Sequence, residues 1–245
     1  YFPIAGQIAW SIIFIYLWQY ATYRSLRYRL TRTRWRGIRC NLAGNAASYA
    51  WKGTLYFLLM ILSFGLLTPF SLSRMISLKL NNMHFGARKL HFHGSPGGLY
   101  KAIMLPFMGM LIFMALFVGA ILMLAYNAEH AGYYSEGVDE IEAYVSYFPL
   151  ALVAGLIGLL LFSSFLQAAF TRWLFRHMQF GDAQTRSTLM GAKLLGTYTT
   201  NLLLVLFTFG IGRAWAEMRL YRATLNSIDY TGDPSLHELL QDTIE

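Results

Sequence analysis

Five long apolar runs, free of Asp, Glu, Lys and Arg, dominate the pattern of hydrophobic and polar positions. They cover residues 4–23, 53–73, 102–126, 143–171 and 194–212. A helix needs roughly 20 apolar residues to cross the hydrocarbon core of a bilayer, and each run meets or approaches that length. One such run fits a buried helix of a soluble domain, but five do not. The pattern predicts an all-α integral membrane protein with about five hydrophobic segments.

Two of these runs share an interruption. Residues 53–80 and 196–225 each open with Gly-Thr, and each reaches a Phe-Gly pair, at Phe64-Gly65 and Phe209-Gly210. An aromatic residue and an arginine follow at the same distances from each glycine (Phe70 and Arg74; Trp215 and Arg219). Because glycine adopts positive φ without steric cost, the chain can turn at each pair. We expect internally duplicated units, each with a segment broken at Phe-Gly.

Short aromatic–glycine elements recur outside the apolar runs. Their glycines stand at 37, 86, 181 and 232, at intervals of 49, 95 and 51 residues. A spacing near 50, with one doubled interval, indicates internal duplication. The alternating stretch 89–94 predicts a short extended piece. We expect small cytoplasmic turns or β-hairpins at these elements.

The polar segments between the runs differ sharply in charge. Residues 21–52 hold eight basic residues and no acid, and residues 73–101 hold five basic residues and no acid. Residues 127–144 hold five acids and neither Lys nor Arg. Lys and Arg concentrate in cytoplasmic loops beside membrane segments. The charges therefore predict a multi-pass protein of the bacterial inner (plasma) membrane, with basic loops in the cytoplasm and loop 127–144 in the periplasm.

Five simple spans conflict with this assignment, because they would place basic segments on the periplasmic face. The conflict disappears if segments 53–73 and 194–212 are re-entrant, so that each enters and leaves on the cytoplasmic side. The alternative is a helix that breaks at Phe-Gly and still spans, with its arginines reaching the interface. Both interpretations stay open. We expect a first repeat half at 1–126 and a second at 145–245, with a further piece of chain before Tyr1.

The residues around the Phe-Gly pairs resemble a known family. The two matching stretches are Thr208-Phe209-Gly210-Ile211, Trp215, Arg219, Tyr221-Arg222, Thr224 and Asp229-Tyr230-Thr231-Gly232, and Ser63-Phe64-Gly65-Leu66, Phe70, Arg74, Asn81-Asn82, Phe85-Gly86 and Leu90-His91-Phe92-His93-Gly94. They are similar to the YjgN-like bacterial inner-membrane proteins, catalogued as domain of unknown function number 898. The elements around Gly37 and Gly181 lack the Phe-x-Phe-x-Gly ending of that family. The resemblance implies class and location, and no activity or catalytic residue.

No recognisable catalytic motif is present, and no carboxylate interrupts the apolar runs, where proton or cation coupling usually places one. We therefore expect no enzyme activity and no cofactor. His91 and His93 would share one face of an extended piece and are weak metal candidates, but neither Cys nor an acid lies near them in sequence. The arginine-rich stretch after the first run is the expected topology signal, so we expect no nucleic-acid partner.

Softer polar positions in the broken segments remain as candidates for a ligand site or cavity. They are Gly65, Gly210, Thr54, Thr197, Asn201 and Thr208. Such residues often serve only helix packing, but duplicated broken helices are also typical of transporters. The candidates for contact with anionic lipid headgroups are Arg24, Arg27, Arg34, Arg74 and Arg219. We expect a protein that binds or moves a lipid or small solute.

The alternative is a non-catalytic structural or accessory subunit of a larger membrane complex, for instance beside a protease. Its partner would be another membrane protein or a second copy of the chain. The absence of a strongly polar site favours this alternative, as do the 40 Phe, Tyr and Trp residues, which suit surfaces that face lipid or a partner.

Overall fold

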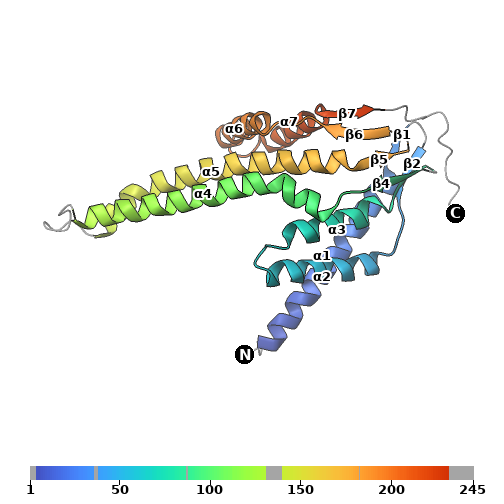
Figure 1. Cartoon of the computed structure of the whole chain (residues 1–245), viewed down its shortest axis with the longest axis horizontal. Helices are drawn as coiled ribbons and strands as arrows, with labels where there is room; N and C mark the ends of the chain where they lie inside the picture. The colour runs from blue at the N-terminus through green and yellow to red at the C-terminus, as the bar shows by residue number, and fades with distance from the viewer. Residues whose placement is uncertain (1–3, 36–37, 87, 131–139, 182, 232–245) are drawn as a thin grey trace. The chain divides into compact units, whose positions relative to one another are not determined.

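The computed structural model describes residues 4–35, 38–86, 88–130, 140–181 and 183–231 of the chain. Their helices are α1 (Ile4–Arg32), α2 (Ala46–Leu62), α3 (Thr68–Leu80), α4 (Pro96–His130), α5 (Glu140–Arg176), α6 (Gly191–Phe207) and α7 (Arg213–Leu225). Their strands are β1 (Arg34–Trp35), β2 (Ile38–Leu42), β3 (Met83–Phe85), β4 (Arg88–Phe92), β5 (Met178–Phe180), β6 (Ala183–Ser187) and β7 (Ile228–Thr231). Figure 1 shows these elements along the chain.

The described strands form one sheet in the order β1-β2-β3-β4-β5-β6-β7. The expected β-hairpins are confirmed as the antiparallel pairs β1–β2, β3–β4 and β5–β6. They also pair with each other, since Cys40 lies opposite Phe85 and Leu90 lies opposite Phe180. The described chain is mostly helical, as predicted, but it also contains this sheet, so the predicted all-α class holds only in part. The aromatic–glycine elements indicate the separate hairpins, whereas pairing between hairpins joins residues far apart in sequence.

Two glycines fit the short turns of these β-hairpins. Gly86 and Gly181 follow β3 and β5 directly and have φ values of 57° and 60°. Two-residue turns between antiparallel strands favour positive φ at their first central position, which suits glycine. The aromatic–glycine signal therefore marks the end of one strand and the start of its return.

The inner face of the sheet packs against helices. Leu42 of β2 is fully buried in a cluster with Tyr23 of α1 and Tyr49 of α2. Phe92 of β4 is also buried, and its ring meets Trp173 of α5 edge-on with 5.4 Å between centroids. Aromatic pairs of this kind add stability beyond the burial of their surface.

The chain divides into two compact units. The first comprises residues 1–100, 173–187 and 229–245, and the second comprises residues 101–172 and 188–228. The first holds α1, α2, α3 and the sheet. The second holds α6, α7 and most of α4 and α5, with a small core around Ala168, Leu189 and Leu194. The division into halves at 1–126 and 145–245 stays a prediction.

Among the described residues, two helices are long and apolar enough to cross a membrane, over Pro96–Met123 in α4 and Leu152–Arg176 in α5. Of the 18-residue apolar stretch in each helix, none is buried inside the molecule in α4 and only 22% is buried in α5. Phenylalanine rings fill the places left by glycines between them. A Cβ added at Gly158 would lie 2.1 Å from Phe113, and one added at Gly109 would lie 3.0 Å from Phe162. Small residues let membrane helices approach closely in this way.

Element bounds recur after 145 residues. β2 and β6 begin at residues 38 and 183, α2 and α6 at 46 and 191, and α3 and α7 at 68 and 213. Each pair also has equal length, with 5, 17 and 13 residues respectively. This interval brings Phe64 onto Phe209, but it brings Thr54 onto Thr199 rather than Thr197. The shared Gly-Thr openings are therefore two residues out of register.

Candidate functional site

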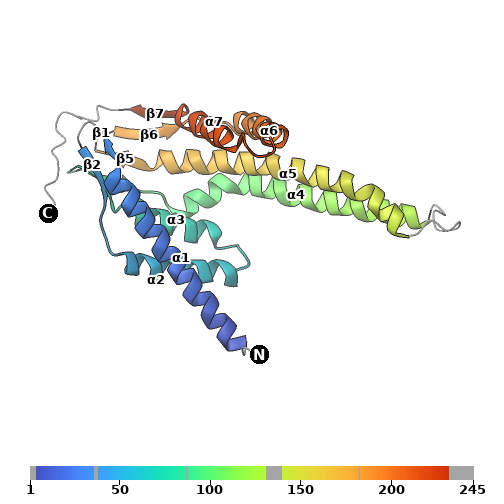
Figure 2. The ribbon, with the colours of Figure 1, turned by 180° about the vertical axis from the view of Figure 1, so that it is seen from behind.

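The two broken segments each fold back as a helical hairpin, α2 with α3 and α6 with α7 (Figure 2). In the first hairpin, the Ser71 hydroxyl donates a hydrogen bond to the carbonyl oxygen of Tyr56 at 2.9 Å. In the second, the Asn201 amide donates to the carbonyl oxygen of Ala216 at 2.8 Å. These are the same two positions, 145 residues apart, with the donor moved to the opposite limb. Each bond holds an outgoing helix to its return.

The tips of the hairpins share one backbone conformation. Phe64 and Phe209 have φ values of 50° and 49°, and the glycines after them have values of 85° and 91°. The Gly65 N–H donates to the carbonyl oxygen of Met60 at 2.9 Å, and the Gly210 N–H donates to that of Val205 at 2.8 Å. This is the hydrogen bond by which a left-handed residue closes a helix end.

A hydroxyl completes each tip. The Ser63 Oγ accepts a hydrogen bond from the Leu67 N–H at 3.0 Å, and the Thr208 Oγ1 accepts one from the Gly212 N–H at 2.8 Å. Backbone groups at a helix end need such partners when water is scarce. Thr208, a predicted ligand residue, therefore has a structural role in the turn.

Phenylalanine at the left-handed tip position is unusual. For residues other than glycine, asparagine and aspartate this conformation costs roughly 1–2 kcal/mol. The Phe64 and Phe209 side chains nevertheless stand 98% and 96% exposed. Their neighbours Leu62, Leu66, Phe207 and Ile211 are exposed as well. A strained residue at a fully exposed position points to a function for its side chain rather than for the fold.

Each hairpin is closed at its base by a backbone hydrogen bond. The Ala43 N–H donates to the carbonyl oxygen of Asn82, and the Thr188 N–H donates to that of Ser227, both at 2.8 Å. Ala43 and Asn82 flank the first hairpin as Thr188 and Ser227 flank the second. The chain therefore enters and leaves each hairpin at a single point.

The predicted threonines Thr54 and Thr197 donate their hydroxyl protons within their own helices. Thr54 is buried, and its hydroxyl donates to the carbonyl oxygen of Ala50 in its own helix. The Thr197 hydroxyl does the same with Lys193. Asn201 differs, because its buried Oδ1 has no hydrogen-bond partner in the described part of the chain. Of the predicted ligand residues, Asn201 is the one whose side chain leaves an atom unsatisfied.

Arg74 and Arg219 occupy equivalent positions on the returning helices. The exposed Arg74 guanidinium lies 5.5 Å from the centroid of the Phe70 ring. The Arg219 guanidinium donates to the Thr200 hydroxyl at 3.2 Å. The other headgroup candidates lie on different elements, with Arg24 and Arg27 on α1 and Arg34 on β1.

His91 and His93 lie at the end of β4 with both rings exposed. The rings stack on each other at 6.2 Å between centroids and nearly parallel. No group of three His, Cys, Asp or Glu among the described residues could hold a metal ion. The described part of the chain therefore offers these two histidines no further ligands to complete a zinc site.

An ion pair on α7 is a feature that apolar patterning passes over. The Arg213 guanidinium donates to the Glu217 carboxylate at 3.2 Å, and both side chains are exposed. The corresponding positions of the first hairpin are Thr68 and Leu72. The two hairpins therefore share a backbone and differ in charge beside the tip. The spacing of Arg213 and Glu217, four residues apart on one predicted helix, is the signal that could have indicated this pair.

Lys79, at the sheet end of α3, is a cation without an acid beside it in the sequence. Its ammonium lies 5.4 Å from the centroid of the Tyr49 ring, and residues 1–128 hold no Asp or Glu. Burial lowers the pKa of Lys79. Burial, together with the neighbouring Tyr23, raises the pKa of Tyr49 to about 12. Such perturbed groups occur both in functional sites and in structural clusters.

Replacing Lys79 by methionine is expected to raise the midpoint of thermal unfolding in detergent at pH 7. The folded protein releases the Lys79 proton at a lower pH than the unfolded chain does, because the ordinary pKa of a lysine is 10.5 and burial lowers the pKa of Lys79. The lysine therefore costs stability below its folded pKa, and this cost disappears as the pH rises towards 10.5. The gain from Lys79→Met should shrink over the same range. The matched change at exposed Lys52 should have little effect, and an equal gain there would contradict the argument.

Comparison with known proteins places the chain in a family. The family model that matches is described as bacterial protein of unknown function (DUF898), and it covers residues 2–245. No curated protein and no solved structure matches the chain. The match takes in the sheet, both hairpins and the two long apolar helices, and it confirms the resemblance drawn from the Phe-Gly segments. The chain belongs to the DUF898 family of bacterial proteins of unknown function.

Proposed function

We propose that this protein is a multi-pass protein of the bacterial inner membrane and that its two hairpins bind phospholipid from the cytoplasmic side. In this proposal α1, α4 and α5 cross the bilayer, and loop 127–144 faces the periplasm. The hairpins arise from an internal duplication and are re-entrant. Their apolar tips contact acyl chains, and arginines on their returning helices contact phosphates. The proposal assigns neither a catalytic role nor a cofactor.

The hydrogen bond at the base of each hairpin carries the proposal. Atoms 2.8 Å apart, at the entry and exit of one segment, cannot lie on opposite faces of a bilayer whose hydrocarbon core is about 30 Å thick. This supports re-entry over the alternative of a broken helix that spans. It also allows all the basic segments to share one side of the membrane, as the positive-inside rule requires.

The exposed tips support lipid as the ligand. In water, the six apolar tip residues would form two hydrophobic patches of the kind that marks interaction sites. The contacts of the first tip also limit its depth. The Tyr100 hydroxyl donates to the carbonyl oxygen of Leu66 at 2.6 Å, and Lys101 is the last charge before the apolar run of α4. The first tip therefore enters only the outermost acyl region, roughly the 5–10 Å reached by interfacial helices.

This depth suits the two arginines. Arg74 and Arg219 follow their tip glycines by nine residues, or about 14 Å of helix. A tip inserted by about 5–10 Å leaves the guanidinium a few ångströms outside the hydrocarbon, in the headgroup layer. Arginine binds phosphate oxygens in a bidentate geometry. The same spacing on both hairpins supports a shared mode of lipid contact.

Cysteine labelling in intact cells tests the topology. On a Cys40→Ser background, single cysteines replace Arg39 and Lys89 around the first hairpin, Gln184 and Tyr230 around the second, and Ser135 in the acidic loop. A membrane-impermeant maleimide is expected to reach the Ser135 site alone from outside. The other four sites should react only after the inner membrane is permeabilised.

The controls lie within the set, since each hairpin is bracketed by two sites. If the Gln184 and Tyr230 sites react from opposite sides, the second segment crosses the bilayer and the proposal is wrong for it. If Ser135 is protected from outside, α4 and α5 do not cross as proposed.

A second candidate function, an accessory subunit of a membrane complex, is favoured by one observation. Along β1 to β6 the sheet has a polar face that no described helix covers. A polar surface does not need to be covered by lipid acyl chains, so this face suits contact with a soluble partner.

A further inference from the structure

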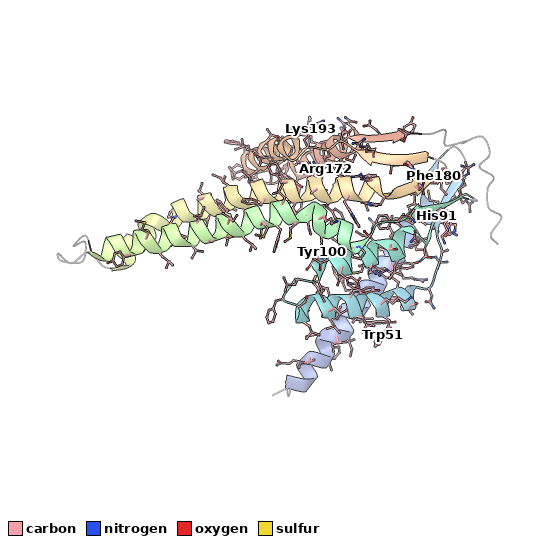
Figure 3. All side chains as sticks on the ribbon, viewed as in Figure 1. Trp51, His91, Tyr100, Arg172, Phe180 and Lys193 are labelled. Carbon is pink, nitrogen blue, oxygen red and sulfur yellow. The ribbon has the colours of Figure 1, made fainter. Side chains whose placement is uncertain are left out.

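Strand register defines the uncovered face. Residues opposite one another in an antiparallel pair project to the same side, as do alternate residues of one strand. The pairs are Arg34 with Arg39, Asn41 with His84, His84 with Lys89, His91 with Gln179, and Gln179 with Gln184. Alternation adds Arg186 on β6. These nine residues and His93, which directly follows β4, are called the open face (His91 is labelled in Figure 3).

The open face is basic and polar throughout. Its members are three arginines, one lysine, three histidines, one asparagine and two glutamines, with His93 counted among the histidines and Arg34, Arg39 and Arg186 among the arginines. The described residues of β1 to β6 contain no carboxylate, and the one acid of β7 is Asp229 at the edge. The opposite face instead presents apolar side chains such as Leu42, Phe85 and Phe92.

Two arginines face each other directly on this surface. Arg34 and Arg39 are cross-strand neighbours, and both are exposed. Like charges directly opposite in a sheet are destabilising by a few tenths of a kcal/mol or more. An acidic group bound between them would remove this repulsion. The described residues of β1 to β6 supply no such group, so an acidic partner would complement this pair.

The helices that pack on the inner face determine the direction in which the open face points. Leu42 and Phe92 project from the inner face onto α1 and α5. The open face is therefore turned away from the helices that contact the sheet, and away from a bilayer that those helices enter. Lipid headgroups of the same membrane are thus a poor fit for this surface.

We propose that the open face docks an acidic segment of a cytoplasmic protein partner. Carboxylates would accept hydrogen bonds from the guanidinium, ammonium, imidazole and amide groups of the face, and charged partners strengthen such bonds. Nucleic acid is disfavoured, because the described open face has no Phe, Tyr or Trp on which bases could stack. Its two adjacent histidine rings, His91 and His93, stack on each other. This inference rests on the proposed cytoplasmic placement of the sheet, but not on insertion of the hairpins.

Binding to a fluorescent poly-glutamate peptide of about 30 residues tests the inference with the detergent-solubilised full chain. One variant combines Arg39→Gln, Lys89→Gln and Arg186→Gln, one change each on β2, β4 and β6. Its matched control combines Arg24→Gln, Arg29→Gln and Arg32→Gln on α1, which removes the same charge. The open-face variant is expected to bind about tenfold more weakly, or ~1.4 kcal/mol, and the control variant less than twofold more weakly.

Equal losses in the two variants would overturn the inference, because binding would then follow total charge rather than the open face. Tighter binding of a single-stranded RNA of equal length, lost in the same variant, would make the occupant a nucleic acid and would also overturn it. Tighter binding to nanodiscs that contain anionic lipid would do so in favour of a membrane. If the triple variant unfolds, Lys89→Gln alone should weaken poly-glutamate binding more than Arg29→Gln, and equal binding would contradict the proposal.

Discussion

Aspartate in place of both Phe64 and Phe209 is expected to release the hairpin tips from the membrane. Moving a phenylalanine side chain from an apolar environment into water costs about 1.5–3 kcal/mol, and an ionised aspartate at membrane depth is itself strongly disfavoured. Both tips change in the double variant, so the two losses add. The fold should survive, because both rings are almost wholly exposed and support no core.

A nitroxide attached to a cysteine at Leu66, on a Cys40→Ser background, measures this effect in liposomes. With Phe64 and Phe209 present, the nitroxide should collide with dissolved oxygen and be shielded from a water-soluble nickel chelate. In the double aspartate variant it should become accessible to the chelate. The matched control is Tyr28→Asp, which places the same charge on the exposed basic end of α1. If the chelate has full access to the nitroxide in the labelled protein that keeps Phe64 and Phe209, the first tip does not enter the bilayer.

Leu194→Ala is expected to cause the largest loss of stability among changes in the second compact unit. Leu194 is fully buried and lies with Ala168 and Leu189 in the small core that holds the base of α6. Truncation of a buried leucine to alanine costs about 2–5 kcal/mol, because apolar contacts are lost and a cavity remains. Since Ala168 is already small, the surroundings have little means to fill the space.

Thermal unfolding followed by helical circular dichroism in detergent measures the Leu194 effect. Leu206→Ala is the control, because Leu206 lies on the same helix with its side chain exposed. The control should shift the unfolding midpoint only slightly. If both variants unfold at the same temperature, the cluster around Leu194 does not stabilise the hairpin base.

The breaks at the two tips could be predicted from the sequence, but their backbone could not. Glycine after an apolar run indicates a turn, and Gly65 and Gly210 take the positive φ that makes this possible. Nothing in local preference places Phe64 and Phe209 in the left-handed region, where phenylalanine is disfavoured. The tertiary hairpin overrides the preference of the residue.

The sheet is the part of the fold that the prediction of a mostly helical protein did not include. Short strands such as Met83–Phe85 carry too few residues for a clear alternating signal, and their pairing with β2 depends on residues more than 40 positions away. The sequence also did not reveal which residues of the two helical hairpins correspond to each other. Gly-Thr opens both segments in sequence, yet the helices begin at Ala46 and Gly191, which sets the interval at 145 residues.

A ligand-binding role for Asn201 and Thr208 stays a prediction. Both residues lie in the second hairpin, where the bond from Asn201 to Ala216 has its counterpart in a first-hairpin bond that starts from Ser71 on the other limb. Side-chain identity therefore does not repeat where the geometry does. The pair Arg213–Glu217 lies outside the apolar runs, so a search limited to those runs passes over it.

The order of the strands has a consequence for biosynthesis. Because neighbours in the sheet are also neighbours along the chain, each strand that leaves the ribosome finds its partner already at the growing edge. Pairing therefore proceeds from β1 towards β7 without any earlier strand being displaced. The longest pause falls between β4 and β5, while α4 and α5 are made. During that pause β4 is an open edge, so the time taken to make those two helices is the time for which the incomplete sheet is exposed to pairing with another chain.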